Sequence, residues 1–430
     1  MALQQIMHSS APTLGTVNGH SVLMVDGMPF ILLGGEVHNS SSSSLKYMEQ
    51  VWEKAESLGM NCLLLSVTWE LVEPEEGCFD FSLVQGLIEQ ARAHGMKIAF
   101  LWFGAWKNAQ CYYAPAWVKT DTRRFRRAEI EKGKGFIRMK DFYDMPYTSL
   151  SYLCEETMRA DARAFGRLMA FIREIDGNEH TVVSMQIENE TGVMGAAREH
   201  SDEADTLFAS PVPGDFARSM RSAVNTMTPD MKKAVENGKP SGTWSEVFGP
   251  EAEEVFSAYH IARYVNTVAE AGKKEYSLPF SVNCWLNKAG EPAGMYPSGG
   301  PVSKMREVWR FCAPNIDLYA PDIYLPNFTE ICDEYTRRGE ALFIPECAIH
   351  RYAAARNILC IGRYHAACYS PFGFEDMGLP LNAQQMALFG ADAQDPALAS
   401  PQEVEPYGKI NQLLNGMMAR LTAQYGTDHL

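Results

Sequence analysis

Two acids that end apolar segments are the residues of this sequence best placed to do chemistry. The stretch "TVVSMQIENETG" (181–192) begins as an apolar, β-type run and ends in Glu188, Asn189 and Glu190. A second run, "ALFIPECAIH" (341–350), stops on Glu346. Acids at the end of a buried strand are not core residues, so they are solvated, paired or catalytic. In an extended chain Glu188 and Glu190 share a side, and Asn189 faces the other way unless the strand bends or bulges there.

A pair of carboxyl groups on either side of one bond is what glycoside hydrolysis requires. One must be protonated to assist the leaving oxygen, and the other must be ionised to attack the anomeric carbon. A separation of about 5–5.5 Å between them indicates retention, and a wider gap indicates inversion. The sequence leaves that distance open. The alternative for Glu346 is an ion pair at the rim of the fold.

Eight short apolar segments alternate with helical patterns and predict the fold that positions these acids. Strands buried on both faces read as near-continuous apolar runs, which is typical of a parallel sheet. No GxGxxG follows the first segment, so an open dinucleotide-binding sheet is disfavoured. We therefore predict an α/β fold, a (β/α)8 TIM barrel, in which strands four and seven lie across the mouth from each other. The eight predicted strands are 30–39, 62–69, 97–106, 181–188, 280–285, 316–324, 341–346 and 366–374.

Helical spacing and two long connections complete the predicted organisation. Apolar residues recur at helical intervals over 45–59, 82–94 and 161–175. Long loops follow strands three and four, over 107–160 and 191–249, and we expect them to form substrate-binding walls or lids at the carboxyl-end face. The alternative is decorative insertion. We expect a catalytic barrel over 1–380 and a C-terminal extension over 381–430 that ends in an amphipathic helix and packs on the barrel.

Composition narrows the class of partner. The net charge of −15 argues against nucleic acid or an anionic membrane as the main partner. The ten cysteines include no CxxC pair, so no zinc site is expected, nor any other metal or cofactor. No secretory signal is visible and no apolar run reaches about 18 residues, so we expect a cytoplasmic protein. The sequence leaves the oligomeric state open, and a homo-oligomer is one option because exposed barrel helices commonly pair.

The chain resembles the clan-A retaining glycosidases, and most of all the family 35 β-galactosidases. The segment "LLGGEVHNSSSSSLKYMEQVWEKAESLGMNCLLLSVTWELVEPEEGCFDF" is similar to that family's opening, with Gly-x-x-His on strand one and Trp, then Glu-Pro, after strand two. "QIENETG" resembles its acid/base segment, and Glu346 stands where its nucleophile does. The resemblance covers about residues 20 to 375. The Asn-Glu motif is specific for the clan and less so for the family.

The resemblance implies a role for each matching residue. Glu190 would be the general acid/base and Glu346 the nucleophile of a retaining exo-β-glycosidase that acts on oligosaccharides or glycoconjugates. Asn189 would donate to the sugar 2-hydroxyl. Tyr324, at the end of strand six, resembles the tyrosine that donates to the nucleophile, and Tyr319 is the second candidate.

One departure from the family concerns the sugar. Family 35 usually has Ala-Glu-Trp at the end of strand three, whereas this chain has Trp106, Lys107 and Asn108. We expect Trp106 and Asn108 to belong to an altered sugar-binding wall. The alternatives to a β-galactosidase are a β-glucosidase, β-mannosidase or α-L-arabinofuranosidase, and outside catalysis an idle barrel that binds glycans. The family's C-terminal β domains are not seen, which suggests a minimal or truncated form.

Further candidates lie at other predicted strand ends. Glu36 and His38 end strand one, and one of them is expected to contact a sugar hydroxyl. Trp285 is expected to stack on a pyranose face, and Trp69 is a weaker candidate whose alternative is core packing. The run "TDTRRFRR" would suit an anionic substrate if it overhung the mouth, although arginines at this density usually form a solvated face.

Overall fold

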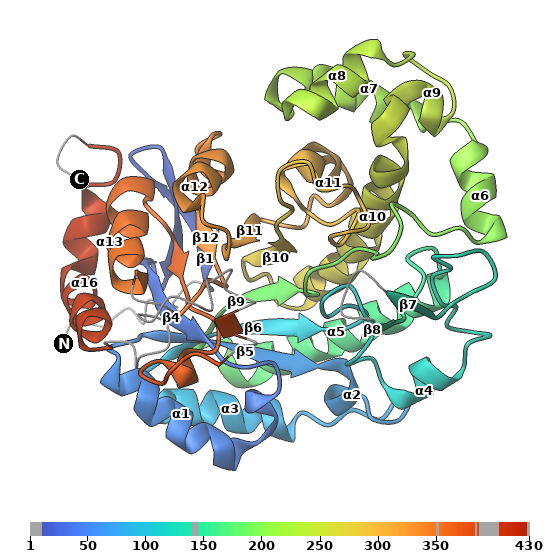
Figure 1. The fold of residues 1–430 in the computed structure, drawn as a ribbon. Helices are drawn as coiled ribbons and strands as arrows, with labels where there is room; N and C mark the ends of the chain where they lie inside the picture. Colours follow the sequence, from blue (N-terminus) through green and yellow to red (C-terminus); the bar gives the residue numbers. More distant parts are fainter. Residues whose placement is uncertain (1–10, 140–144, 350–351, 383–384, 387–403, 428–430) are drawn as a thin grey trace, which may run out of the picture.

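A computed structural model describes residues 11–139, 145–349, 352–382, 385–386 and 404–427. Its centre is a sheet of eight strands in the order β11-β10-β9-β6-β5-β4-β13-β12, paired in parallel (Figure 1). A parallel bridge between Ile323 and Cys347 joins the two outer strands and closes the sheet into a barrel. The predicted (β/α)8 TIM barrel is confirmed. In chain order the strands are β4 (Leu32–Glu36), β5 (Cys62–Thr68), β6 (Lys97–Phe103), β9 (Val182–Ile187), β10 (Phe280–Trp285), β11 (Leu318–Asp322), β12 (Phe343–Ile344) and β13 (Cys368–Tyr369).

One long helix follows each barrel strand. Helix α1 begins where the Ser44 hydroxyl accepts from the Tyr47 N–H at 3.2 Å, and Gly59 follows its end at φ +61°. Both are ordinary helix-end signals, which is why this helix was predictable. The eight helices are α1 (Leu45–Ser57), α3 (Ser82–Ala93), α5 (Glu155–Asp176), α10 (Ala252–Glu275), α11 (Arg306–Cys312), α12 (Phe328–Thr336), α13 (Ala353–Tyr364) and α16 (Glu405–Ala423).

The apolar residues form two layers. One layer lies between the strands and the surrounding helices. The other fills the barrel, and its members include Leu64, Leu101 and Phe103, which alternate with outward-facing neighbours along their strands. Because both faces of each strand are covered, the strands read as continuous apolar runs in the sequence.

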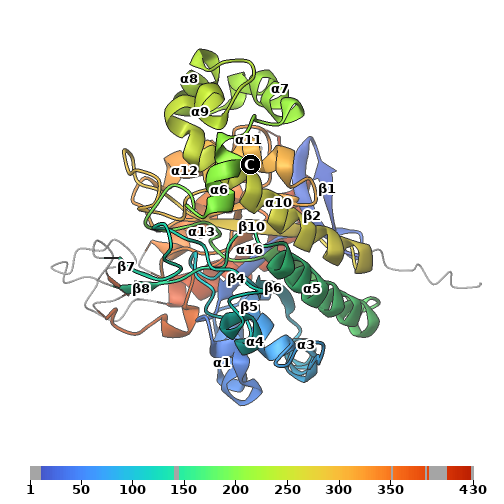
Figure 2. The ribbon, with the colours of Figure 1, turned by 90° about the vertical axis from the view of Figure 1, so that its right-hand side faces the viewer.

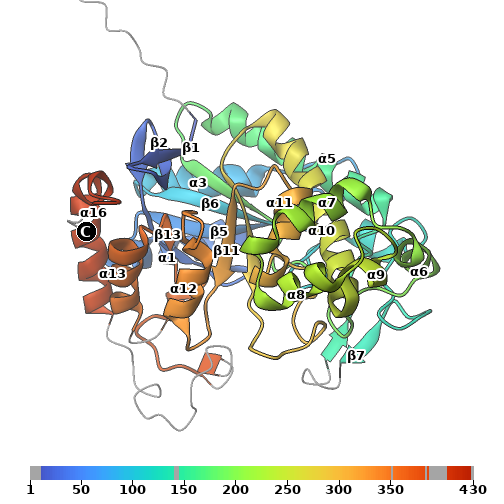
Figure 3. The ribbon, with the colours of Figure 1, turned by 90° about the horizontal axis from the view of Figure 1, so that it is seen from above.

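A small antiparallel sheet closes the amino end of the barrel. It consists of β1 (Thr13–Val17), β2 (His20–Val25) and β3 (Met28–Phe30). Leu23 and Val25 of β2 pack into the interior layer of the barrel. Figures 2 and 3 show β1 and β2 at one end of the barrel and β7 at the opposite end. The carboxyl-end face is therefore left for the site.

The two long connections contain more regular structure than their sequences suggested. The connection after β6 holds α4 (Ala116–Thr120), β7 (Ile137–Met139) and β8 (Met145–Tyr147). The long connection predicted after strand four is present, and it contains the helices α6 (Asp202–Ala209), α7 (Gly214–Ser222), α8 (Pro229–Asn237) and α9 (Trp244–Phe248). Shorter elements are α2 (Trp69–Val72) and the 3-10 helices η1 (Ser41–Ser43), η2 (Val224–Thr226), η3 (Gly249–Glu251), η4 (Ser303–Met305) and η5 (Phe374–Asp376).

Aromatic packing explains why the second connection is helical. Phe216 of α7 lies 4.9 Å from Tyr259 of α10 and 5.4 Å from Phe311 of α11, measured between ring centroids. Trp244 of α9 joins the same cluster at 5.9 Å from Phe216. Helices α7 to α9 therefore cover the outer side of α10 and α11 (Figures 1 and 2). A role for them as a lid stays a prediction.

Helix α16 lies in the segment predicted as a C-terminal extension, of which 383–384, 387–403 and 428–430 are outside the described residues. Its Asn411 donates to the Leu58 carbonyl at 2.9 Å and accepts from Asn357 of α13 at 2.7 Å. The helix thus packs between α13 and α1, where the eighth helix of a barrel belongs (Figure 1). The domain boundary at residue 380 stays a prediction. No described helix is long and apolar enough to cross a membrane.

Replacing Asn411 tests how much α16 contributes to stability. Asn411→Leu leaves the Leu58 carbonyl and the Asn357 amide buried without partners, so the free energy of unfolding should fall by at least about 1–3 kcal/mol. Urea denaturation followed by circular dichroism measures the change. Arg420→Ala, on the exposed side of the same helix, is the control and should change stability by less than about 0.5 kcal/mol. Equal stabilities for the two variants would contradict the packing role.

Candidate active site

The structure brings the two predicted acids together at the carboxyl end of the barrel. One carboxylate oxygen each of Glu190, Glu346 and Asp322 lies within 4.8 Å of the other two. All three side chains are buried, with 5%, 4% and 2% of their residues' surface exposed. Two of these groups were predicted from sequence, and the third was not.

Left-handed backbone at the end of β9 turns both Asn189 and Glu190 into the site. Glu188 has φ +60° and Glu190 has φ +45°, a region that side-chain-bearing residues rarely adopt. The alternation of side chains along the extended strand therefore ends at Ile187. The chain bends after this residue, as the sequence allowed. Strain of this kind persists only where surrounding contacts hold it.

A matching turn after β6 supplies those contacts. Asn108 and Ala109 are also left-handed, at φ +51° and +58°. The Asn189 N–H donates to the Trp106 carbonyl at 3.3 Å, and the Ala109 N–H donates to the Glu190 carbonyl at 3.0 Å. The two turns are thereby joined to each other through their backbones.

The surroundings of Glu190 favour its protonated form. Its Oε2 accepts from the Asn108 side-chain amide at 2.5 Å, and its backbone N–H donates to Asn283 Oδ1 at 2.9 Å. Burial, followed by the nearby charge of Glu346, raises the pKa of Glu190 to about 8, against the opposing charge of Lys107. A carboxyl group with this pKa is protonated at neutral pH.

Glu346 lies among hydrogen-bond donors. Tyr324 donates to its Oε2 at 2.8 Å, which is the contact predicted for this tyrosine. The amides of Asn189 and Asn283 approach its Oε1 at 3.4 and 3.3 Å. Donors of this kind favour the ionised form of a carboxyl group. The second candidate, Tyr319, lies instead beneath Arg310. The distance from the Tyr319 ring centroid to the guanidinium carbon of Arg310 is 6.0 Å.

Lys107 sets the orientation of Asn189. Its ammonium donates to Asn189 Oδ1 at 2.9 Å, so the NH2 group of the asparagine must face Glu346. An asparagine oriented in this way presents a donor to whatever lies against the nucleophile candidate.

Glu36 ends β4 and faces the same volume. Its residue is 1% exposed, and neither carboxyl oxygen has a hydrogen-bond partner. Burial, then the charge of Glu346, raises its pKa well above the ordinary value, with Lys107 opposing. An unpartnered buried carboxyl group in this position is suited to contact a ligand hydroxyl, as predicted for Glu36.

Asp322 and Asn283 were missed in the sequence. Asn283 is the fourth residue of β10 and Asp322 the last of β11, and both sit inside apolar runs. Asn283 Nδ2 donates to Asp322 Oδ2 at 2.8 Å. The signal in the sequence was a polar residue near the end of a strand, at a position whose side chain points into the barrel. This signal is weak evidence until the neighbouring strands are known.

A second buried acid pair lies behind the turn, between Glu188 and Asp161 of α5. Asp161 accepts from Trp102 Nε1 at 2.8 Å and from the Tyr264 hydroxyl at 2.9 Å. Glu188 accepts from the backbone N–H of Trp106 at 2.8 Å. Burial, followed by the charge of Asp161, raises the pKa of Glu188 well above its usual value. Glu188 therefore supports the turn and does not face the site.

The three tryptophans differ in placement. Trp106 is 1% exposed and packs edge-on against Tyr264 at 4.8 Å, so its backbone contacts the site wall while its ring faces the core. Trp69 is fully buried and donates to Glu73 at 2.9 Å, which agrees with core packing. Trp285 ends β10 partly exposed, on the same strand face as Asn283. Stacking on a sugar by Trp285 or Trp106 stays a prediction.

His38 and the arginine-rich segment have other partners. His38 Nε2 lies 3.0 Å from Asp376. Arg124 pairs with Glu76 at 2.9 Å, and Arg126 pairs with Glu203 of α6 at 2.6 Å. These ion pairs tie the segment to neighbouring acids, as on an ordinary solvated face, and they give no support to anion recognition.

The carboxyl cluster could in principle hold a divalent cation. Amide and phenol donors already point at these oxygens, from Asn108, Asn283 and Tyr324. That pattern fits hydrogen-bonded carboxyl groups better than metal ligands, and the predicted lack of a metal stays a prediction.

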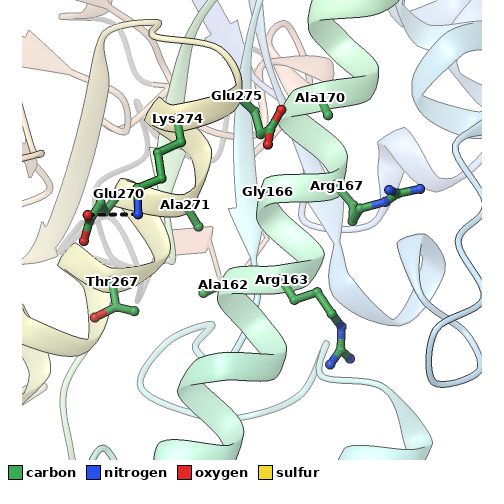
Figure 4. Close-up of a pocket in the computed structure, with 10 residues that line it drawn as sticks. All are labelled: Ala162, Arg163, Gly166, Arg167, Ala170, Thr267, Glu270, Ala271, Lys274 and Glu275. Carbon is green, nitrogen blue, oxygen red and sulfur yellow. Dashed lines mark ion pairs between the residues drawn. The ribbon is translucent and has the colours of Figure 1, made fainter.

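A shallow depression on the outside of the barrel is separate from this cluster. It lies between α5 and α10 around Gly166 and Ala271, beside an ion pair of 3.0 Å between Glu270 and Lys274 (Figure 4). None of its lining residues belongs to the carboxyl cluster.

The raised pKa of Glu188 predicts a pH-dependent stability. Below the pKa of the unfolded chain, about 4.3, its contribution is fully present, and it is lost as the pH rises toward the folded value. Glu188→Gln keeps an acceptor for the Trp106 N–H and a donor for Asp161. The variant should match the wild type at pH 5 and be the more stable protein at pH 8.5, as measured by urea denaturation. Glu89→Gln on the exposed face of α3 is the control, and an equal loss at both pH values would contradict a protonated Glu188.

Comparisons with known proteins agree with this geometry. Residues 22–142 match the model of Glycosyl hydrolases family 35. A β-galactosidase of Xanthomonas manihotis is 28% identical over 254 residues, which are 57% of this chain and 37% of that protein. The chain thus spans little more than a third of that relative's length.

Solved structures share the fold at low identity. A β-galactosidase of Rahnella sp. R3 aligns over 91% of this chain and 57% of its own, with 13% identity and a TM-score of 0.54. A β-galactosidase of Bacillus circulans sp. alkalophilus aligns over 92% and 57%, with 11% identity and a TM-score of 0.56. The catalytic domain of a β-amylase of Paenibacillus polymyxa aligns over 88% and 97%, with 10% identity and a TM-score of 0.56. These structures show that the chain shares its fold with β-galactosidases, and its residues 22–142 are similar to glycosyl hydrolase family 35.

Proposed function

We propose that this protein is a retaining exo-β-glycosidase, with terminal β-galactosides as its first expected substrates. The observation that carries the proposal is the pairing of Glu190 with Glu346. Their carboxylate oxygens lie within 4.8 Å, one side chain in an environment that favours its proton and the other among donors that favour its charge. This asymmetry is what a double displacement needs.

Each side chain has a defined task in the proposed reaction. Glu346 attacks the anomeric carbon while protonated Glu190 gives its proton to the leaving oxygen, which forms a glycosyl-enzyme. Glu190, now ionised, takes a proton from the water that attacks this intermediate, and Glu346 departs. Asn189, oriented by Lys107, donates to the sugar 2-hydroxyl.

The sugar is the less constrained part of the proposal. The segment after β6 reads Trp106-Lys107-Asn108 where the resembled family usually has Ala-Glu-Trp, and Glu36 supplies a buried carboxyl group from β4 near Glu346 and Lys107. We therefore infer that Glu36 accepts from a sugar hydroxyl. A panel of aryl β-glycosides tests the specificity, with the β-galactoside expected to be cleaved fastest. Binding to some glycosides with hydrolysis of none would favour the idle barrel.

Conservative variants of the two acids test the assigned roles. Glu346→Gln and Glu190→Gln should each lower kcat for natural glycosides by about 10³-fold or more, because the attacking or protonating group is lost. Initial rates with purified variants of wild-type-like circular dichroism measure this. The neighbouring Glu375→Gln, outside the cluster, is the matched control. Wild-type-like rates in either cluster variant would end the assignment.

Rescue by azide separates the two roles and tests retention. In Glu190→Ala an activated aryl β-glycoside still forms the glycosyl-enzyme, and azide, which needs no general base, should release a β-glycosyl azide. In Glu346→Ala azide replaces the nucleophile itself and should give the α-anomer. Proton NMR of the products distinguishes the anomers. Identical anomers from both variants, or an α-sugar as the first product of the wild type, would contradict retention.

A further inference from the structure

A two-acid mechanism leaves the third carboxyl group, that of Asp322, without a task. Asp322 ends β11 and is 2% exposed. Its Oδ2 accepts from Asn283 at 2.8 Å, whereas its Oδ1 is buried and no described residue donates a hydrogen bond to it. A buried carboxylate oxygen with no donor is unfavourable, so this oxygen requires an explanation.

A proton on Asp322 resolves the unpaired oxygen. One carboxylate oxygen of Asp322 lies within 4.8 Å of one oxygen each of Glu190 and Glu346. Two carboxyl groups form a hydrogen bond only when at least one carries a proton, because two carboxylates offer acceptors and no donor.

The surroundings of Asp322 disfavour its charge. Burial, and then the charges of Glu346 and Glu190, raise its pKa well above the ordinary value. The ammonium of Lys107 donates to Asn189 Oδ1 at 2.9 Å and is not among the main causes that shift the pKa of Asp322. The titratable groups that face this region from the packed elements are Glu36 of β4, Lys107 after β6, Glu190 after β9, Cys284 of β10, Tyr324 after β11 and Glu346 after β12.

We propose that Asp322 remains a neutral carboxylic acid throughout the cycle and donates a hydrogen bond to Glu190 whenever Glu190 is ionised. The inference rests on the proposed function, in which Glu190 alternates between acid and base. Asp322 acts through Glu190 and is thus a positioning residue. Its donated hydrogen bond limits the rise of the Glu190 pKa that burial causes, which keeps Glu190 able to release its proton.

Two substitutions at residue 322 separate a neutral donor from an ionised acid. Asp322→Asn reproduces the protonated group, with an acceptor for Asn283 and a donor for Glu190. The basic limb of its kcat/KM profile should stay where it is in the wild type. Asp322→Leu removes the donor, and that limb should move to higher pH by about one unit, since ionised Glu190 loses a hydrogen bond. Asp333→Asn on α12, outside the cluster, is the control.

Three results would overturn the proposal. A basic limb that moves to lower pH in Asp322→Asn would mean that a negative charge had been removed, so Asp322 was ionised. An unmoved limb in both variants would mean that no hydrogen bond couples the two groups. A shift of the acidic limb alone would assign the donor to Glu346.

A spectroscopic readout keeps the test independent of folding defects and of activity. A protonated carboxyl group has an infrared carbonyl band above that of a carboxylate. The wild-type minus Asp322→Asn difference spectrum at pH 7 should contain this band, and the Asp333→Asn difference spectrum should not. Absence of the band overturns the inference even if the Leu variant fails to fold. If the wild type cleaves no glycoside, the proposed function fails, while the band still decides the state of Asp322.

Discussion

The crowding of carboxyl groups in one buried volume is the constraint on which the site depends. Glu36, Glu190, Asp322 and Glu346 come from four different strands and are all at least nine-tenths buried. Four negative charges at such distances would repel strongly in a medium of low dielectric constant. Burial and the neighbouring acids raise the pKa of Asp322, Glu190 and Glu36, and the ammonium of Lys107 and the donors of asparagine and tyrosine side chains oppose the crowded negative charge.

The barrel places the site residues at its mouth, and two strained turns set the directions of their side chains. Strands alone would point Glu188 and Glu190 to the same side, and Asn189 away. Left-handed backbone at Glu188 and Glu190 instead brings Asn189 and Glu190 into the mouth together. The acid pair of Glu188 and Asp161 and the backbone contacts from Trp106 and Ala109 hold this conformation. The neighbouring Gly104 has no space for a side chain, since an added Cβ would lie 2.6 Å from Glu188 and 2.7 Å from Asp161.

Lys107 affects both the geometry and the charge of the site. Its ammonium fixes the Asn189 amide and offsets part of the negative potential of the cluster. No described residue donates a hydrogen bond to the buried carboxyl oxygens of Glu36, which lie near this charge. The same fold also occurs in a β-amylase catalytic domain, so the fold alone does not choose the sugar.

The sequence by itself determined the barrel and the two acids. Both follow from local signals: apolar runs of strand length, helical spacing between them, and carboxylates at positions where a core residue was expected, as at Glu190 and Glu346. Tyr324 could also be named, from its place after strand six. Only the tertiary structure decided that Asp322 and Asn283 join the site, that Glu188 turns away from it, and that the segment 191–249 forms helices. These features arise from contacts between distant segments, such as Asn283 with Asp322 or Phe216 with Tyr259 and Phe311. Burial and charge then set the protonation of each acid, and neither is present in the chain before it folds.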